Sequence, residues 1–137
     1  MPDEASLLLA FELLRNNPAY HAAEVLRRRT PGGSGAMASA PEGSEERRAV
    51  LLLISTWEVI AVLMDGVKKP DKVFEVTPVC HMYDELKAAI EALARHIPGF
   101  GANFVRLSAE YQAWLKKKKK DAKYISAACG GMHAKFG

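Results

Sequence analysis

One segment of this 137-residue chain constrains the fold more than any other. Over residues 45–66, apolar side chains cover almost the whole circumference of a helix, namely Val50, Leu51, Leu52, Leu53, Ile54, Trp57, Val59, Ile60, Ala61, Val62, Leu63 and Met64. A helix that is apolar on all sides is typical of the centre of a fold. Ser44 can cap its N-terminus, two glutamates then suit the positive end of the helix dipole, and Gly66 can end it. We therefore predict that residues 45–66 form the central helix of the protein.

The same segment is also the best candidate for a membrane span. Its apolar stretch, residues 49–64, has 16 residues and contains Ser55, Thr56 and Glu58. A spanning helix needs about 20 mostly apolar residues, and a central carboxylate costs a few kcal/mol in the bilayer. We therefore expect a buried core helix and no membrane span.

Two further apolar stripes follow the central segment at helical spacing. The first consists of Tyr83, Leu86, Ile90, Leu93 and Ile97, and the second of Phe104, Leu107, Tyr111 and Trp114. Pro98 and Gly99 mark a short turn between them, so the two helices should be antiparallel neighbours. Thr77 can cap the first of these helices, and Pro78 fits its first position. A short helical turn before it should bury Val73, Phe74 and Val76.

Residues 3–29 carry a helical pattern that is interrupted near Asn17. The ring of Pro18 pushes the preceding residue out of the helical region, which predicts two helices meeting there or one sharply kinked helix. Residues 30–44 follow with four glycines, two prolines and almost no bulky side chain. Such a segment buries too little area to offset the entropy cost of ordering, so we predict a flexible loop.

Together these patterns predict an all-α protein, folded as an up-and-down helical bundle of about four main helices. Residues 1–115 should form a single helical domain, with the flexible loop at 30–44 after the first helical segment. Residues 116–137 should form a lysine-rich C-terminal tail that frays.

The net charge of +3 is distributed unevenly along the chain. Residues 116–137 hold seven lysines and one aspartate, whereas the first 115 residues hold 12 basic and 15 acidic side chains. The candidate polyanion-binding residues are Lys116, Lys117, Lys118, Lys119 and Lys120. Such lysines can neutralise the phosphates of nucleic acid or approach an anionic lipid surface. The alternative is a solvated helix end whose cations complement the dipole, because no stacking aromatic or base-reading motif accompanies the lysines.

Glu58 lies in the most apolar helix and is the candidate for a functional buried acid. A desolvated carboxylate can have a raised pKa and act as an acid or a base. The alternative, which we favour, is that it points to the bundle surface or bonds one buried donor and so fixes packing. No second catalytic group can be placed beside it from the sequence.

The cysteines and histidines do not define a metal site. Atoms that bind zinc occur in Cys80, His81, Cys129 and His133. However, the adjacent Cys80 and His81 diverge on a helix, and two glycines lie within the other pair. Nothing in the sequence orients His21 or His96 toward a cysteine nucleophile, and the glycines at 32–35 lack the flanking residues of a phosphate loop. We predict no metal, no cofactor and no catalytic residue.

Three stretches resemble a family of uncharacterised bacterial and phage all-helical domains of unknown function. They read WEVIAVLMDGV from Trp57, YDELKAAIEAL from Tyr83, and GANFVRLSAEYQAW up to Trp114. The matching positions are Trp57, Glu58, Gly66, Tyr83, Leu86, Tyr111 and Trp114. The resemblance implies a helical fold and carries no activity. This chain departs from the members that look membrane-anchored at the N-terminus, because it lacks a spanning segment.

The sequence favours a non-enzymatic protein–protein interaction or regulatory module, because several apolar stripes offer partner surfaces and no catalytic constellation emerges. The protein partner is not identified by the sequence, and self-association into a homo-oligomer is a subsidiary expectation. One alternative is binding of nucleic acid or an anionic surface through residues 116–120, and a second is a small enzyme that uses Glu58. With only two cysteines and no secretory leader pattern, we expect a cytoplasmic protein.

Overall fold

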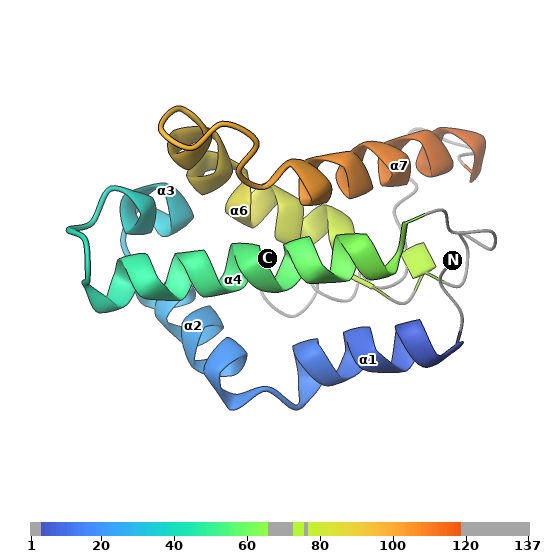
Figure 1. The fold of residues 1–137 in the computed structure, drawn as a ribbon, viewed down its shortest axis with the longest axis horizontal. Coiled ribbons are helices and arrows are strands. Elements are labelled where there is room, and N and C mark those ends of the chain that lie inside the picture. Colours follow the sequence, from blue (N-terminus) through green and yellow to red (C-terminus); the bar gives the residue numbers. More distant parts are fainter. Residues whose placement is uncertain (1–3, 66–72, 76, 119–137) are drawn as a thin grey trace.

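The computed structural model describes residues 4–65, 73–75 and 77–118. Within these residues no strand occurs, and six helices pack against one another (Figure 1). They are α1 (Glu4–Arg15), α2 (Pro18–Arg29), α3 (Gly33–Ala38), α4 (Glu45–Leu63), α6 (Val79–Ala94) and α7 (Ala102–Lys118). The predicted all-α bundle is confirmed.

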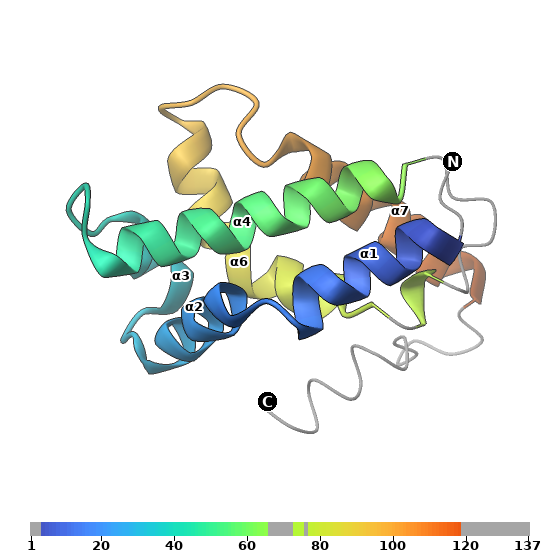
Figure 2. The ribbon, with the colours of Figure 1, turned by 60° about the horizontal axis from the view of Figure 1, so that its bottom comes forward.

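Helix α4 is the centre of the bundle, as its all-round apolar surface predicts. It contacts each of the other five helices. Figure 1 shows α1 and α2 along one side of α4 and α6 and α7 along the other, and the turned view of Figure 2 keeps α1 and α2 on their side. The hydroxyl of Ser44 accepts a hydrogen bond from the backbone N–H of Arg47 at 3.2 Å and so caps the helix as expected. The helix begins at Glu45 as predicted and ends at Leu63, within the predicted range of residues 45–66.

The first helical pattern forms two helices that meet at Asn17. Its side-chain oxygen accepts hydrogen bonds from the backbone N–H groups of Ala19 and Tyr20, at 3.1 and 3.3 Å. Pro18 is the first residue of α2, where a missing N–H costs nothing because that group has no intrahelical acceptor. The sequence allowed either two helices or one kinked helix, and the structure has two separate helices.

The segment predicted to be a flexible loop, residues 30–44, contains helix α3 instead. Met37 is fully buried, and the hydroxyl of Ser34 donates a hydrogen bond to the backbone carbonyl of Glu85 on α6 at 2.5 Å. A Cβ atom built on Gly35 would lie 3.3 Å from the Cβ of Ala88, so the lack of a side chain lets α3 approach α6 closely. The prediction of a flexible loop is wrong, because small residues in this segment let the backbones of α3 and α6 come into contact.

The start of α6 also differs from its predicted form. The hydroxyl of Thr77 donates to the backbone carbonyl of Val73 at 2.6 Å and does not cap α6, whose N-cap residue is Pro78. Val73 and Phe74 are buried as predicted, and Val76 lies outside the described residues. A threonine hydroxyl that bonds a carbonyl four residues back competes with the capping arrangement that the sequence suggested.

The two predicted apolar stripes form most of the core on the far side of α4. All four stripe residues of α7 are buried, and so are Leu86, Ile90 and Leu93 of α6. Ile97 is an exception, because α6 ends at Ala94 and the Ile97 side chain is half exposed. The ring of Phe104 stacks on Trp57 with centroids 5.0 Å apart, which joins α7 to the central helix.

Candidate functional site

The lysine run is only partly described by the structure. Helix α7 continues as far as Lys118, three residues past the predicted domain end at 115. Lys116 and Lys117 are exposed on its last turn. Lys119 and Lys120 lie outside the described residues. The placed lysines therefore complement the negative end of the α7 dipole and also present positive charge to solvent.

Glu58 lies between α4 and α7. Its Oε1 atom accepts a hydrogen bond from the backbone N–H of Phe104 at 2.9 Å, and Oε2 accepts from the side-chain amide of Asn103 at 2.8 Å. One turn further along, the Arg106 guanidinium donates to the carbonyl of Ala61 at 3.2 Å. The first N–H groups of a helix have no intrahelical acceptor, and a carboxylate there also meets the positive end of the dipole. Glu58 thus caps α7 from a neighbouring helix.

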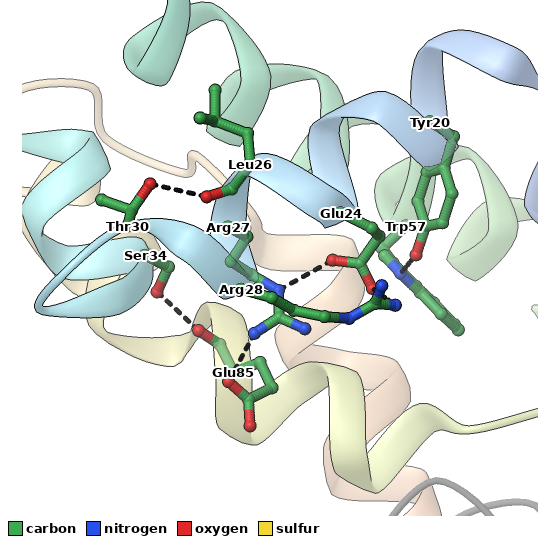
Figure 3. Close-up of polar contacts among 9 residues, drawn as sticks. All are labelled: Tyr20, Glu24, Leu26, Arg27, Arg28, Thr30, Ser34, Trp57 and Glu85. Atoms are coloured by element: carbon green, nitrogen blue, oxygen red, sulfur yellow. Dashed lines mark hydrogen bonds and ion pairs between the residues drawn. The ribbon is translucent and has the colours of Figure 1, made fainter. Parts of the chain in front are cut away.

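A buried ion-pair cluster joins α2 to α6, and the sequence alone did not identify it. We call Glu24, Arg27 and Glu85 the arginine junction. The Nε atom of Arg27 donates to Glu24 at 2.7 Å, and its Nη1 atom donates to Glu85 at 2.6 Å. Figure 3 shows the Arg27 guanidinium between these two carboxylates. Arg28 extends toward the same Glu24 carboxylate, with a longer approach of 3.8 Å.

A pocket of about 330 Å³ opens beside this cluster. We call it the junction pocket, and its lining residues are Arg27, Arg28, Thr30, Gly33, His81 and Glu85. The last turn of α2 supplies Arg27 and Arg28, Thr30 is the residue that caps α2, Gly33 begins α3, and α6 supplies His81 and Glu85. These two lie four residues apart and so share one helix face. This spacing is visible in the sequence and places both side chains on one face of α6. No local pattern in the sequence indicates that α2 packs against that face.

Of the four candidate residues with zinc-type side chains, only Cys80 and His81 lie in the described residues, and Cys80 is disulfide-bonded. Cys80 is half buried and His81 is buried at the start of α6. Cys129 and His133 lie outside the described residues. No group of three or more side chains able to hold a metal ion occurs among the residues that the structure covers.

Tyr20 and Trp57 form a buried polar contact between α2 and α4. The indole Nε1 of Trp57 donates to the hydroxyl of Tyr20 at 3.0 Å (Figure 3). Burial raises the pKa of the Tyr20 phenol well above its ordinary value, and the nearby Glu24 carboxylate raises it further. The phenol therefore stays protonated and serves as a structural acceptor.

One face of α4 keeps apolar side chains in contact with solvent. We call it the α4 stripe, and it consists of Leu51, Leu52, Ser55, Val59, Val62 and Leu63. The side chains of Val59 and Val62 are 49% and 59% exposed. The three leucines are partly buried and pack on the core. A surface of this kind on the central helix is a candidate contact site for another protein.

Comparisons with protein-family models, with curated proteins and with solved structures find no match for this chain. The resemblance to bacterial and phage helical domains therefore stays a prediction. Within the described ranges, no helix has both the length and the apolar character needed to cross a membrane.

Proposed function

We propose that this protein is a non-enzymatic helical module for protein–protein interaction, with the α4 stripe as its contact surface. The observation that carries the proposal is the exposure of Val59 and Val62 on a helix whose other faces form the core. Covering apolar surface is favourable by about 25 cal/mol per Å². Binding of a partner that covers this exposed apolar stripe is therefore favourable.

The occupant that the charges favour is a second copy of the same chain. Arg48 is exposed near the N-terminal end of the stripe. Asp65 follows the C-terminal end, where one carboxylate oxygen lies 3.3 Å from the Arg106 guanidinium of the same chain and the side chain remains 63% exposed. Two copies that pack α4 against α4 in antiparallel fashion bring Arg48 of each copy toward Asp65 of the other. A parallel arrangement would bring the two Arg48 side chains together. Ser55, small and near the middle of the stripe, allows a close approach.

Other features agree with a binding role rather than an enzymatic one. The Glu58 carboxylate accepts two hydrogen bonds in a helix contact, which supports a structural role for this acid. An origin in bacteria or phage is part of the same proposal and rests on the family resemblance. The cytoplasmic location expected from the cysteine count is not proposed, because Cys80 is disulfide-bonded and disulfides are rare in the cytoplasm.

Light scattering after size-exclusion chromatography tests the proposal between about 1 and 100 µM protein, a range that brackets micromolar dissociation constants. The native chain should change from monomer to dimer over this range. The double variant Val59→Lys/Val62→Lys should stay monomeric. Val25→Lys, at a position 40% exposed on α2, is the matched control and should dimerise normally. A native chain that remains monomeric throughout removes the second copy as occupant and leaves a different protein as the partner to be sought.

The exposure of Lys116 and Lys117 favours a second candidate function, the binding of nucleic acid or an anionic surface. Binding through the lysine run should weaken steeply as salt rises, because neutralised phosphates release counterions. Fluorescence anisotropy with labelled duplex DNA, and sedimentation with acidic vesicles, measure this. Changing all five lysines at 116–120 to Gln should abolish binding, whereas the exposed Lys87→Gln on α6 should not. Equal affinity in the five-fold variant eliminates this function.

A further inference from the structure

The side chain of Arg27 is fixed at the wall of the junction pocket. It is only 6% exposed, and its contacts with Glu24 and Glu85 hold the guanidinium at two points. These contacts use Nε and Nη1, and within the described residues no acceptor binds Nη2. A guanidinium has five N–H donors, so donors remain for a ligand. A planar guanidinium held in place is well suited to bind a carboxylate.

A negatively charged group, the Glu85 carboxylate, lies on the α6 side of the same pocket. Glu85 gives one oxygen, Oε2, to Arg27, and its side chain is 39% exposed. Its other oxygen takes part in neither Arg27 contact and can accept from an ammonium group. The hydroxyl of Thr30 donates to the carbonyl of Leu26 at 2.7 Å, which orients the hydroxyl and leaves its lone pairs as acceptors.

The charges around the pocket balance. Glu24 and Glu85 are negative, and Arg27 and Arg28 are positive. A ligand with one charge of either sign would leave an uncompensated charge in a partly buried site, which costs free energy. A ligand that carries both charges keeps the balance and satisfies donors and acceptors on both walls.

We propose that the junction pocket binds a small zwitterion of the amino-acid type. The carboxylate lies against Arg27 and Arg28, and the ammonium group lies against Glu85 and the Thr30 hydroxyl. The volume of about 330 Å³ is at the lower end of the range for small-molecule sites and suits a ligand of this size. The site shares no residue with the α4 stripe, so it stands independently of the dimer.

Isothermal titration calorimetry and melting temperature, with each of the 20 standard L-amino acids at about 10 mM, test the assignment. At least one amino acid should bind and raise the melting temperature. Propionate and inorganic phosphate carry no positive group and ethylamine carries no negative group, and each should bind at least about tenfold more weakly. No heat and no melting shift with any amino acid would overturn the proposal. Phosphate or propionate binding as tightly as the best amino acid would overturn it as well.

Two neighbouring arginines provide a matched pair of variants. Arg28 lines the pocket, whereas Arg29, the next residue on α2, is exposed and does not line it. Arg28→Gln should weaken amino-acid binding by about tenfold or more, and Arg29→Gln should leave it unchanged. Equal affinities in the two variants contradict the assignment. Glu85→Gln should weaken amino-acid binding, because the ammonium group needs that carboxylate. The same variant should strengthen propionate binding, because the pocket then carries one uncompensated positive charge.

Discussion

The carboxylate of Glu58 accepts a hydrogen bond from the backbone N–H of Phe104 at 2.9 Å, so a side chain of α4 caps the N-terminus of α7. The same turn of α7 places the Phe104 ring on Trp57, the residue before Glu58. A polar contact and an aromatic contact thus fix one helix against the other at adjacent positions. The capping contact, being directional, sets where α7 begins, and the stacked rings exclude water beside it.

Glu58→Ala should lower the free energy of unfolding by about 1–2 kcal/mol, because it removes a cap and leaves a helix N–H without its acceptor. Glu58→Gln should cost less, since the amide oxygen still accepts although the charge is lost. Urea denaturation followed by circular dichroism measures both. Glu42→Ala, at an exposed position between α3 and α4, serves as control. If Glu42→Ala lowered the free energy of unfolding as much as Glu58→Ala does, the capping role of Glu58 would be contradicted.

The antiparallel dimer makes a prediction about Arg48 and Asp65. Arg48→Asp alone and Asp65→Arg alone should each weaken dimerisation, because each places like charges at the ends of the two stripes. The double variant Arg48→Asp/Asp65→Arg should recover most of the affinity, since the opposite charges then face each other again. The dimer dissociation constant from sedimentation equilibrium is the measurement. A double variant weaker than both single variants excludes this arrangement.

Tyr20→Phe should destabilise the fold by about 1–3 kcal/mol, because the buried indole N–H of Trp57 then has no acceptor. Tyr83→Phe is the matched control. Tyr83 packs edge-on against Phe104 with centroids 5.6 Å apart, and a phenylalanine ring keeps that contact. Urea denaturation should therefore show a larger loss of unfolding free energy for Tyr20→Phe than for Tyr83→Phe. Equal losses would show that the Tyr20 hydroxyl does not stabilise the fold through Trp57.

The stability that Tyr20 contributes should depend on pH. Its folded-state pKa is raised above the ordinary value of 10.0, chiefly by burial. Ionisation of the phenol therefore favours the unfolded chain, and the contribution is fully present below about pH 10 and lost as the pH rises further. The difference in unfolding free energy between the native chain and Tyr20→Phe should stay constant up to that pH and then shrink. A difference that grows above pH 10 would contradict the raised pKa.

How much the sequence predicts depends on whether a feature is local. The stripes of α6 and α7 identify core residues, because helical periodicity reflects burial directly. The all-round apolar surface of α4 identifies the central helix but does not distinguish the exposed Val59 and Val62 from the buried residues. The arginine junction pairs Arg27 with Glu85, 58 positions away, and no local pattern encodes such a contact. The basic residues that end α2 have an adequate local explanation in the helix dipole, which conceals their tertiary role. Glu58 is conspicuous in the sequence, but its partner at the start of α7 is visible only in the fold.

The sequence does not predict helix α3, because its small residues suggest a loop although they allow α3 to pack closely on α6. A substitution at Gly35 tests this explanation. Gly35→Leu should destabilise the protein by about 1–3 kcal/mol, because a side chain at this position meets Ala88 and pushes α3 away from α6. Ala36→Leu places the same side chain at the next, exposed position and should change stability by no more than about 0.5 kcal/mol. Thermal denaturation of the two variants measures this. Equal stabilities would indicate that residues 33–38 form the flexible loop that their composition suggests.

Removing Arg27 should be the most damaging single change in the arginine junction. Arg27→Met keeps the volume of the apolar stem but leaves the buried carboxylate of Glu24 with only the longer Arg28 contact, which costs about 3–5 kcal/mol. Glu24→Gln/Arg27→Met should be much more stable than Arg27→Met, because it removes both buried charges, and the more exposed Glu85 can be hydrated. Arg28→Met, whose contact with Glu24 is long and partly exposed, should cost no more than about 1 kcal/mol. Urea denaturation of the three variants distinguishes a desolvated ion pair from a packing role of the Arg27 stem. If the Arg27 stem acted only by packing, Arg27→Met would leave the stability nearly unchanged. Adding Glu24→Gln to it would then not increase the stability.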